Sequence, residues 1–274
     1  MSDIRKPINN DVFNAVSDFF YRMLAPEIKE ITSPDNIVVA IGGSVSYGFA
    51  DQLSDVDVYI IGDCQEIHRS KTLRKYLFMH QNINGSPVHF IPLHTNNGPY
   101  ASFYCLLREE YEKLKECEEN LLYDLVHYVP IHDPKGSLRK AKDFINNIDY
   151  DFWKERCMEH CTKLIDMLEV FYSSTKRGNN VAICTHFGKA YEGLMQIGYL
   201  LSGKPYPYSK WLWNGLESVD KKIYETIRND IVEKLPCTQE EFIKMIQNLT
   251  QVITRRLKER NTIPLYIIED MMNP

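Results

Sequence analysis

The stretch Ile37–Asp63, IVVAIGGSVSYGFADQLSDVDVYIIGD, decides the fold of this chain. Two short apolar runs lie here, NIVVAIG (residues 36–42, beginning one residue before the stretch) and VDVYIIG (residues 56–62). Both are rich in β-branched residues and typical of buried strands. A glycine pair and a serine end the first run, and two aspartates open the second. The sequence therefore predicts a strand, a glycine turn leading into a helix, and a second strand that carries two acids.

The glycine turn is a candidate phosphate site. Gly42 and Gly43 have no side chains, so the backbone can approach a ligand closely. The free N–H groups at the start of the following helix favour an anion such as phosphate, and Ser44 adds a hydroxyl donor. We therefore expect these three residues to contact a phosphate group.

The paired aspartates are a candidate metal site. Asp55 and Asp57 lie two residues apart in a predicted strand, so both carboxylates project from the same face, while Val56, Val58 and Ile60 point into the core. Two neighbouring carboxylates repel each other unless a cation binds between them, and oxygen ligands suit Mg²⁺. A phosphate site beside paired carboxylates would bring a triphosphate and a metal together, as metal-assisted phosphoryl-type transfer requires.

The sequence GGSVSYG followed by SDVDVYI resembles the nucleotidyltransferase fold of the DNA polymerase beta superfamily. In that pattern Gly-Gly or Gly-Ser is followed, after a short spacer, by Asp-apolar-Asp, and here ten residues separate Ser44 from Asp55. Within the superfamily, the chain is most similar to the bacterial aminoglycoside and lincosamide nucleotidyltransferases and their relatives, which pair this domain with a C-terminal helical bundle. The segment GKPYPYSKWLW, residues 203–213, also resembles such relatives.

The resemblance implies a reaction. Asp55 and Asp57 would be catalytic and would hold one or two Mg²⁺ ions. An NTP, with ATP expected, would be the co-substrate, and a small-molecule hydroxyl would attack its α-phosphate and release pyrophosphate; an antibiotic is a plausible acceptor. Six residues are candidates for binding the nucleotide: Gly42, Gly43, Ser44, Ser54, Lys189 and Lys210. The two lysines belong to the C-terminal part of the chain.

The chain departs from the family at a third carboxylate, which usually lies on a following strand. The matching strand is expected at SPVHFIPLH, residues 86–94, where His89 takes the aligned position and no Asp or Glu is present. Three alternatives remain open. His89 could serve as a base or metal ligand; the acid could come from Glu109, Glu110 or Asp124; or the protein could bind nucleotide without turning it over.

The rest of the chain changes character near Leu138. Before it, helical periodicity is expected at 12–31, after a cap at Asn10 or Asp11, and again at 70–80 and at 102–134, the last with a possible break near its middle. After it, no strand is indicated, and helices are predicted at 151–174, 181–203, 220–235 and 238–260, the last opened by a Thr238–Glu241 capping box. The predicted fold class is α+β, with a mixed sheet and flanking helices in a nucleotidyltransferase domain (1–138) and a helical bundle (139–274).

Composition limits the function classes. The chain has 274 residues, 44% of them apolar, and a net charge of −5, which argues against a nucleic acid partner. No run approaches the ~18 apolar residues of a membrane span, and no signal peptide is indicated. Seven cysteines without a framework spacing predict reduced thiols in a cytoplasmic protein.

Further alternatives concern function and metal binding. The missing acid favours a nucleotide-binding regulator without transferase activity, and a transferase that acts on a protein is a third possibility. Cys157, His160 and Cys161 share one predicted helix face, and Cys184 and His186 lie on the next predicted helix. A zinc site is conceivable there, but buried structural residues are the simpler interpretation. The oligomeric state is not readable from the sequence.

Overall fold

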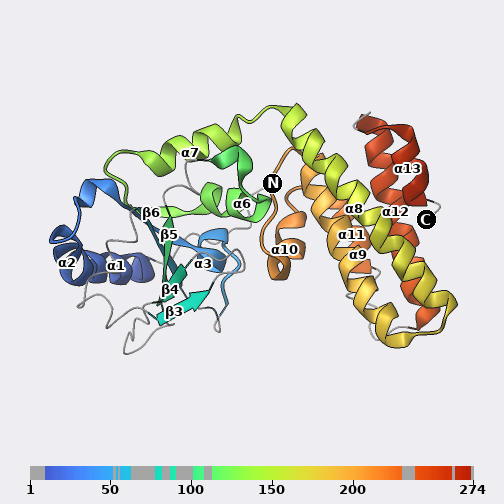
Figure 1. Ribbon diagram of the computed structural model, residues 1–274, viewed down its shortest axis with the longest axis horizontal. Helices are drawn as coiled ribbons and strands as arrows, with labels where there is room; N and C mark the ends of the chain where they lie inside the picture. The colour runs from blue at the N-terminus through green and yellow to red at the C-terminus, as the bar shows by residue number, and fades with distance from the viewer. Residues whose placement is uncertain are drawn as a thin grey trace. The chain divides into compact units, whose positions relative to one another are not determined.

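The computed structural model describes residues 10–51, 54, 56–62, 78–81, 87–90, 101–107, 113–229, 238–260 and 263–272; for the strands between 78 and 107 it describes the backbone. The chain divides into two compact units, Met1–Asn147 and Ile148–Pro274 (Figure 1). The sequence predicts this boundary at 138/139. The boundary lies later because helix α7 (Ser137–Asn146) belongs to the first unit, where Lys142 Nζ donates to the carbonyl of Tyr128 at 2.5 Å.

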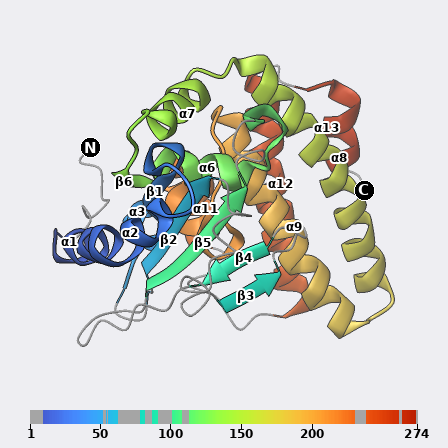
Figure 2. The ribbon, with the colours of Figure 1, turned by 60° about the vertical axis from the view of Figure 1, so that its left-hand side comes forward.

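The first unit is built on a mixed sheet with the strand order β5-β2-β1-β6. Strand β1 pairs antiparallel with β2 and β6, and β2 pairs parallel with β5. Figure 2 shows β1, β2 and β5 side by side. The strands are β1 (Val38–Gly42), β2 (Val56–Gly62), β5 (Ala101–Leu107) and β6 (Val129–His132).

An N-terminal helical segment covers one face of this sheet. It comprises α1 (Asn10–Phe19), the π-helical turn Phe20–Leu24 and α2 (Ala25–Lys29), and it confirms the helix predicted there. Its buried residues recur every four positions, whereas an α-helix repeats every 3.6, so a π turn helps to keep them on one face. They pack on the apolar face of β1 and β2, in a core that includes Val16, Phe20, Leu24, Ile28, Val39, Ile41, Val56, Val58 and Ile60.

The other face of the sheet carries the helices that follow β1 and precede β6 (Figure 1). Helix α3 (Gly43–Tyr47) starts directly where β1 ends, as the glycine turn predicts. Helix α6 (Glu119–His127) runs into β6 through Tyr128, which is fully buried. These short helices place aromatic and acidic side chains over the ends of β1 and β2.

Two strand assignments differ from the sequence prediction. The segment 102–134 was expected to be helical, but its first part is β5 and its last part contains β6. The end of the expected helix at 70–80 belongs to β3 (Phe78–Gln81), which pairs antiparallel with β4 (Pro87–Phe90). A short apolar run such as SFYCLL fits either structure by pattern alone, and the pairing with β2 decides it.

The second unit is helical throughout its described residues, as predicted. Long helices form its core, and none of the helices that the structure describes is long and apolar enough to cross a membrane. The elements are α8 (Tyr150–Lys176), α9 (Asn180–Leu201), the 3₁₀ turn Ser209–Trp211, α10 (Leu212–Leu216), α11 (Lys221–Ile227), α12 (Gln239–Arg260) and α13 (Leu265–Met272).

Side-chain caps define these helix ends. Thr238 N donates to Glu241 Oε2 at 2.6 Å and Glu241 N donates to Thr238 Oγ1 at 3.3 Å, which confirms the predicted capping box. Gly203, predicted as a helix stop, has φ +67° just after α9. Left-handed backbone of this kind is accessible to glycine at little cost.

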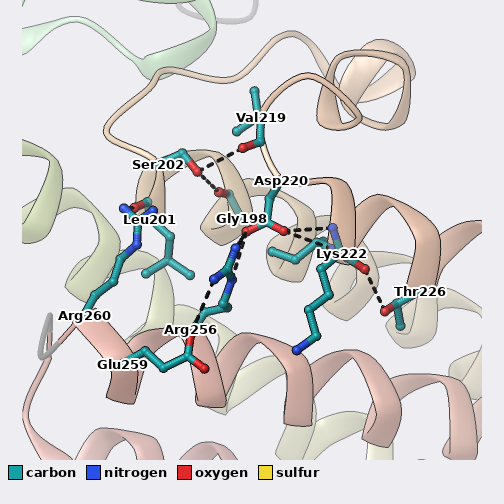
Figure 3. Close-up of polar contacts among 11 residues, drawn as sticks. Gly198, Leu201, Ser202, Val219, Asp220, Lys222, Thr226, Arg256, Glu259 and Arg260 are labelled. Carbon is teal, nitrogen blue, oxygen red and sulfur yellow. Dashed lines mark hydrogen bonds and ion pairs between the residues drawn. The ribbon is translucent and has the colours of Figure 1, made fainter. Parts of the chain in front are cut away.

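One buried ion pair ties α11 to α12 (Figure 3). Asp220 caps α11 by accepting from Lys222 N at 3.1 Å and Ile223 N at 3.2 Å. The same carboxylate accepts two bonds from Arg256, from Nε at 3.1 Å and Nη2 at 2.9 Å. The Asp220 side chain is 4% exposed, so four hydrogen bonds compensate for its removal from water.

Candidate active site

Strand β2 separates its side chains between the core and the opposite face. Val56, Val58 and Ile60 are 3%, 0% and 3% exposed and lie in the core, as the alternation predicts. Asp57 and Tyr59 are half-buried and lie on the other face. Asp55, the other predicted metal ligand, lies outside the described residues, so its place on that face stays a prediction.

The carboxylate of Asp57 lies directly against Gly43. Gly42 and Asp57 are partners in the register of β1 and β2, which brings the end of one strand beside the start of the other. Gly43 has φ +58°, and a Cβ atom built on it would overlap Asp57 Oδ2. Glycine is thus required at this position for two reasons, its backbone conformation and the space that the acid occupies.

Gly42 makes an equally close approach to two aromatic rings. A Cβ atom built on it would overlap ring atoms of Tyr59 and Tyr128. These two rings stack on each other with centroids 4.5 Å apart and planes inclined by 25°. The glycine pair therefore lies beneath a carboxylate and a tyrosine pair, and its lack of side chains makes this packing possible.

Helices α3 and α6 are joined by a polar contact. Tyr47, one turn after Gly43, donates a hydrogen bond from Oη to Asp124 Oδ1. Its ring also packs edge-on against Tyr123 and His127, with centroids 5.1 and 5.6 Å away. Tyr123 and His127 stack on each other at 4.0 Å. The helix that follows the glycine turn is thus held in place by α6.

Burial controls the acid–base properties of this cluster. Desolvation raises the pKa of Asp124 to about 8. The pKa of Tyr128 is raised well above its ordinary value, first by burial and then by Tyr59, Asp124 and Asp57. The carboxylates of Asp57 and Asp124 thus act electrostatically on the same phenol, which places both acids near Tyr128.

Strand β2 lies between β1 and β5 in the sheet. His89 lies on β4, which pairs with β3, whereas β2 pairs with β1 on one side and with β5 on the other, where Ser102 is opposite Asp57. The third acid of the family is expected on a following strand, and β4 is such a strand, so the pairing leaves the alignment of His89 untested. The sequence of β5, ASFYCLL, contains no Asp or Glu.

Among the other acid candidates, Glu109 and Glu110 lie outside the described residues. Asp124 is on α6, on the face of the sheet that carries Asp57. A role for His89 as base or ligand stays a prediction, because only the register of its strand is described. The structure therefore brings one of the alternative acids, Asp124, into the candidate site.

The predicted nucleotide contacts fall into two groups. Ser44 is 4% exposed at the start of α3, and the hydroxyl of Ser54 is engaged in a turn, where it donates to Asp51 Oδ1 at 2.9 Å. Lys189 is exposed on α9, and Lys210 lies with Nζ 5.3 Å from the centre of the Trp211 ring. Both lysines belong to the second unit. Their contacts with a nucleotide stay predictions.

The Cys/His group of the second unit has a structural explanation. Cys157 and Cys161 are fully buried on α8, and His160 Nε2 lies 3.3 Å from the hydroxyl of Tyr206. Cys184 is an exposed free thiol. No group of three or more His, Cys, Asp or Glu side chains among the described residues is arranged to hold a metal ion.

Sequence reasoning missed the tyrosines of the site. Tyr47, Tyr59 and Tyr128 are not among the candidate site residues that the sequence indicates. Tyr59 follows Asp57 by two residues, so its position on the same face was readable from the strand period. The contacts of Tyr47 and Tyr128 with α6 and β2 join distant parts of the chain, and no local pattern indicates them.

Two family models match parts of the chain. Residues 22–151 match the nucleotidyltransferase domain family, and residues 115–212 match a domain of unknown function, DUF4037. No curated protein matches the chain. A similar solved structure is a nucleotidyltransferase-like protein from Exiguobacterium sibiricum 255-15, with 13% identity over 90% of this chain and 78% of that one and a TM-score of 0.47.

The matched region contains the whole described site. It includes the glycine turn, β2 with Asp57, and α6 with Asp124, and it begins within the helical segment that covers the other face of the sheet. The sequence motif, the strand arrangement and the family match thus concern the same residues. Residues 22–151, a little less than half of the chain, therefore match a nucleotidyltransferase domain.

Proposed function

We propose that the protein transfers a nucleoside monophosphate from an NTP, with ATP expected, to a hydroxyl group of a small molecule in a Mg²⁺-dependent reaction. The observation that carries this proposal is the contact of the Asp57 carboxylate with Gly43. It brings the acid of the second strand against the glycine turn that ends the first. A cation on the acid and a phosphate on the turn would then be neighbours.

The donors present suit a magnesium ion. Carboxylate oxygens are among the ligands that Mg²⁺ prefers, and Asp57 is half-buried, so it keeps accessible surface. Asp57 and the predicted ligand Asp55 would hold the ion, which when bound neutralises charge on the phosphates. Asp57 would be fixed in orientation by its packing against Gly43.

The chain's own residues would position the nucleotide. Gly43 and Ser44 would offer backbone N–H groups to the phosphates at the end of β1, beside the Asp57 carboxylate that lies against Gly43. The stacked Tyr59 and Tyr128 rings support the turn from one side. Positioning of this kind accounts for much of the rate of phosphoryl transfer, since little covalent chemistry is left to the protein.

The nature of the acceptor rests on the resemblance to small-molecule transferases, and the family level alone does not specify a substrate. An antibiotic hydroxyl is one candidate. A protein acceptor is the alternative, and mass spectrometry after incubation with isotope-labelled ATP would detect a modified protein.

A second candidate function is favoured by one observation. The strand beside β2 contains no acid, so the protein could bind nucleotide as a regulator without transferring it. Binding and turnover separate the two functions. Calorimetric titration with Mg²⁺ and a non-hydrolysable ATP analogue measures binding, and pyrophosphate release from ATP measures transfer.

Asp57→Asn is the variant that tests the proposal. It preserves the shape of the side chain and removes its charge, so we expect the fold to survive, Mg²⁺-dependent nucleotide binding to weaken at least tenfold, and pyrophosphate release to be abolished. The exposed Asp35→Asn in the same unit is the matched control. A variant Asp57→Asn that binds and releases as the wild type does would refute the metal role of this residue.

A further inference from the structure

A cavity of the first unit lies at the end of the sheet that is remote from the glycine turn, where Val38 and Ile61 line it. These two residues are partners at one end of the register of β1 and β2, and Gly42 and Asp57 are partners at the other. The two ends are roughly 13 Å apart along the strand, at about 3.3 Å per residue. None of the residues described at the candidate active site lines the cavity, so the two places are separate.

The inner wall of this cavity is apolar. Its volume is about 330 Å³, at the lower end of the range of small-molecule sites. Four of its lining residues are at most 6% exposed: Ile37 and Val38 at the start of β1, Ile61 at the end of β2, and Ala141 on α7. Phe144, one turn further along α7, also lines the cavity and is 43% exposed. A ligand with an apolar body therefore finds apolar surface here that water would otherwise contact.

The cavity lining also carries two exposed lysines, Lys135 and Lys140. The ion pairs among the described residues include neither of them. Lys135 Nζ donates to the side-chain oxygen of Asn36 at 2.7 Å, and that amide oxygen is a neutral acceptor. An anionic group at the cavity would therefore meet ammonium groups that no carboxylate of the described part of the chain holds in an ion pair.

The two acids of the lining leave a positive charge in excess. Asp133 caps α7, because its carboxylate accepts from the backbone N–H groups of Ser137 at 2.7 Å and Leu138 at 3.1 Å. The helix N-terminus compensates for the charge of Asp133. Asp35, which is exposed, offsets the charge of one lysine. The second lysine charge remains, so the cavity favours an anionic ligand over a cationic one.

We propose that this cavity is a second binding site, for a small carboxylate with an apolar body such as an arylalkanoate. Lys140 and Phe144 are four residues apart on α7, so their side chains are neighbours on one face of the helix. The carboxylate binds Lys140, and the apolar body packs on Phe144 and the wall formed by Ile37 and Ile61. The proposal stands on the cavity alone and does not depend on the transferase function.

Three probes of similar shape and different charge test the ligand class: hydrocinnamate, its neutral amide, and phenylpropylamine. Each is titrated against the full chain and followed by saturation-transfer NMR. We expect hydrocinnamate to bind saturably with a Kd in the millimolar range or below, as its size allows. The amide should bind roughly two- to fivefold more weakly, the usual effect of one partly exposed ion pair, and the amine more weakly still. An amine that binds as tightly as hydrocinnamate would overturn the assignment of charge.

Two variants locate the site. Ala141→Leu fills the cavity with an apolar side chain from α7, so hydrocinnamate binding should be lost. Lys140→Gln removes one charge and should weaken hydrocinnamate binding roughly two- to fivefold while leaving binding of the amide unchanged. Lys29→Gln, at an exposed lysine on α2 of the same unit, is the matched control and should change neither. Binding by Ala141→Leu with the wild-type Kd would overturn the placement in this cavity.

The remaining outcomes are equally decisive. If circular dichroism shows that Ala141→Leu does not fold, Phe144→Ser takes its place, because this ring is partly exposed; the variant should weaken hydrocinnamate binding, and an unchanged Kd overturns the placement. A saturating Mg²⁺–ATP analogue should leave the Kd of hydrocinnamate unchanged, and displacement by the nucleotide would overturn the claim of a separate site. If hydrocinnamate shows no saturable binding to the wild type, the inference is wrong and the proposed function is untouched.

Discussion

Replacing Gly43 with alanine tests the contact on which the proposed site depends. Gly43 and Gly136 belong to the same unit and have nearly the same backbone conformation, φ +58° and φ +64°. A Cβ atom at Gly136 would meet only the Arg139 guanidinium, at 3.4 Å, whereas one at Gly43 would overlap Asp57 Oδ2. The two alanine variants therefore share the backbone cost and differ in the effect on Asp57.

The magnitudes follow from these two terms. A left-handed conformation costs a residue with a side chain about 1–2 kcal/mol, and the loss of unfolded-chain entropy offsets part of that. Gly136→Ala should therefore destabilise the protein by about 1 kcal/mol. Gly43→Ala adds a displaced or off-rotamer carboxylate, worth roughly 1 kcal/mol more. A shift of about 1 Å in a reacting group can cost about 100-fold in rate.

Urea unfolding of the full chain measures stability, and titration with the Mg²⁺–ATP analogue measures the site. We expect Gly43→Ala to lose more stability than Gly136→Ala and, unlike it, to lose Mg²⁺-dependent nucleotide binding. Adding Asp57→Ala to Gly43→Ala removes the overlapping oxygen, so the double variant should be more stable than the sum of the two single effects. Equal behaviour of the two glycine variants, in both assays, would refute the reasoning.

Three further perturbations probe individual interactions. Burial raises the pKa of Asp124 to about 8 from 3.8, so the contribution of this carboxyl to the free energy of unfolding is complete below about pH 4 and is lost as the pH rises toward 8. Asp124→Asn should flatten this part of the pH dependence measured by urea unfolding. Parallel curves for the variant and the wild type would contradict the pKa shift. Arg256→Met should lower the free energy of unfolding of the second unit by about 3 kcal/mol, because it leaves the carboxylate of Asp220 buried without its cation. Arg255 is exposed, so Arg255→Met is the control and should have little effect on the melting temperature. Thr238→Ala removes the cap of α12 and should cost about 1 kcal/mol in unfolding free energy; an unchanged value would mean that the cap contributes nothing.

Local pattern was sufficient for much of the fold. The alternation of VDVYIIG placed Val56 and Val58 in the core and Asp57 on the opposite face, because a strand has a period of two. The glycine pair marked the turn from β1 into α3, and the capping box marked the start of α12. Each of these features depends on residues that lie within a few positions of one another, so the sequence itself carries the information.

The sequence alone determined the glycine turn, the acid-bearing strand and the helical character of the second unit, since each follows from local periodicity and backbone preference. Only the tertiary structure decided that β5, not β4, lies beside β2, and that Tyr47 meets Asp124 across 77 positions. Parallel pairing and side-chain contacts between distant elements are selected by how well whole surfaces pack, and a short apolar run fits several partners equally until that packing is known.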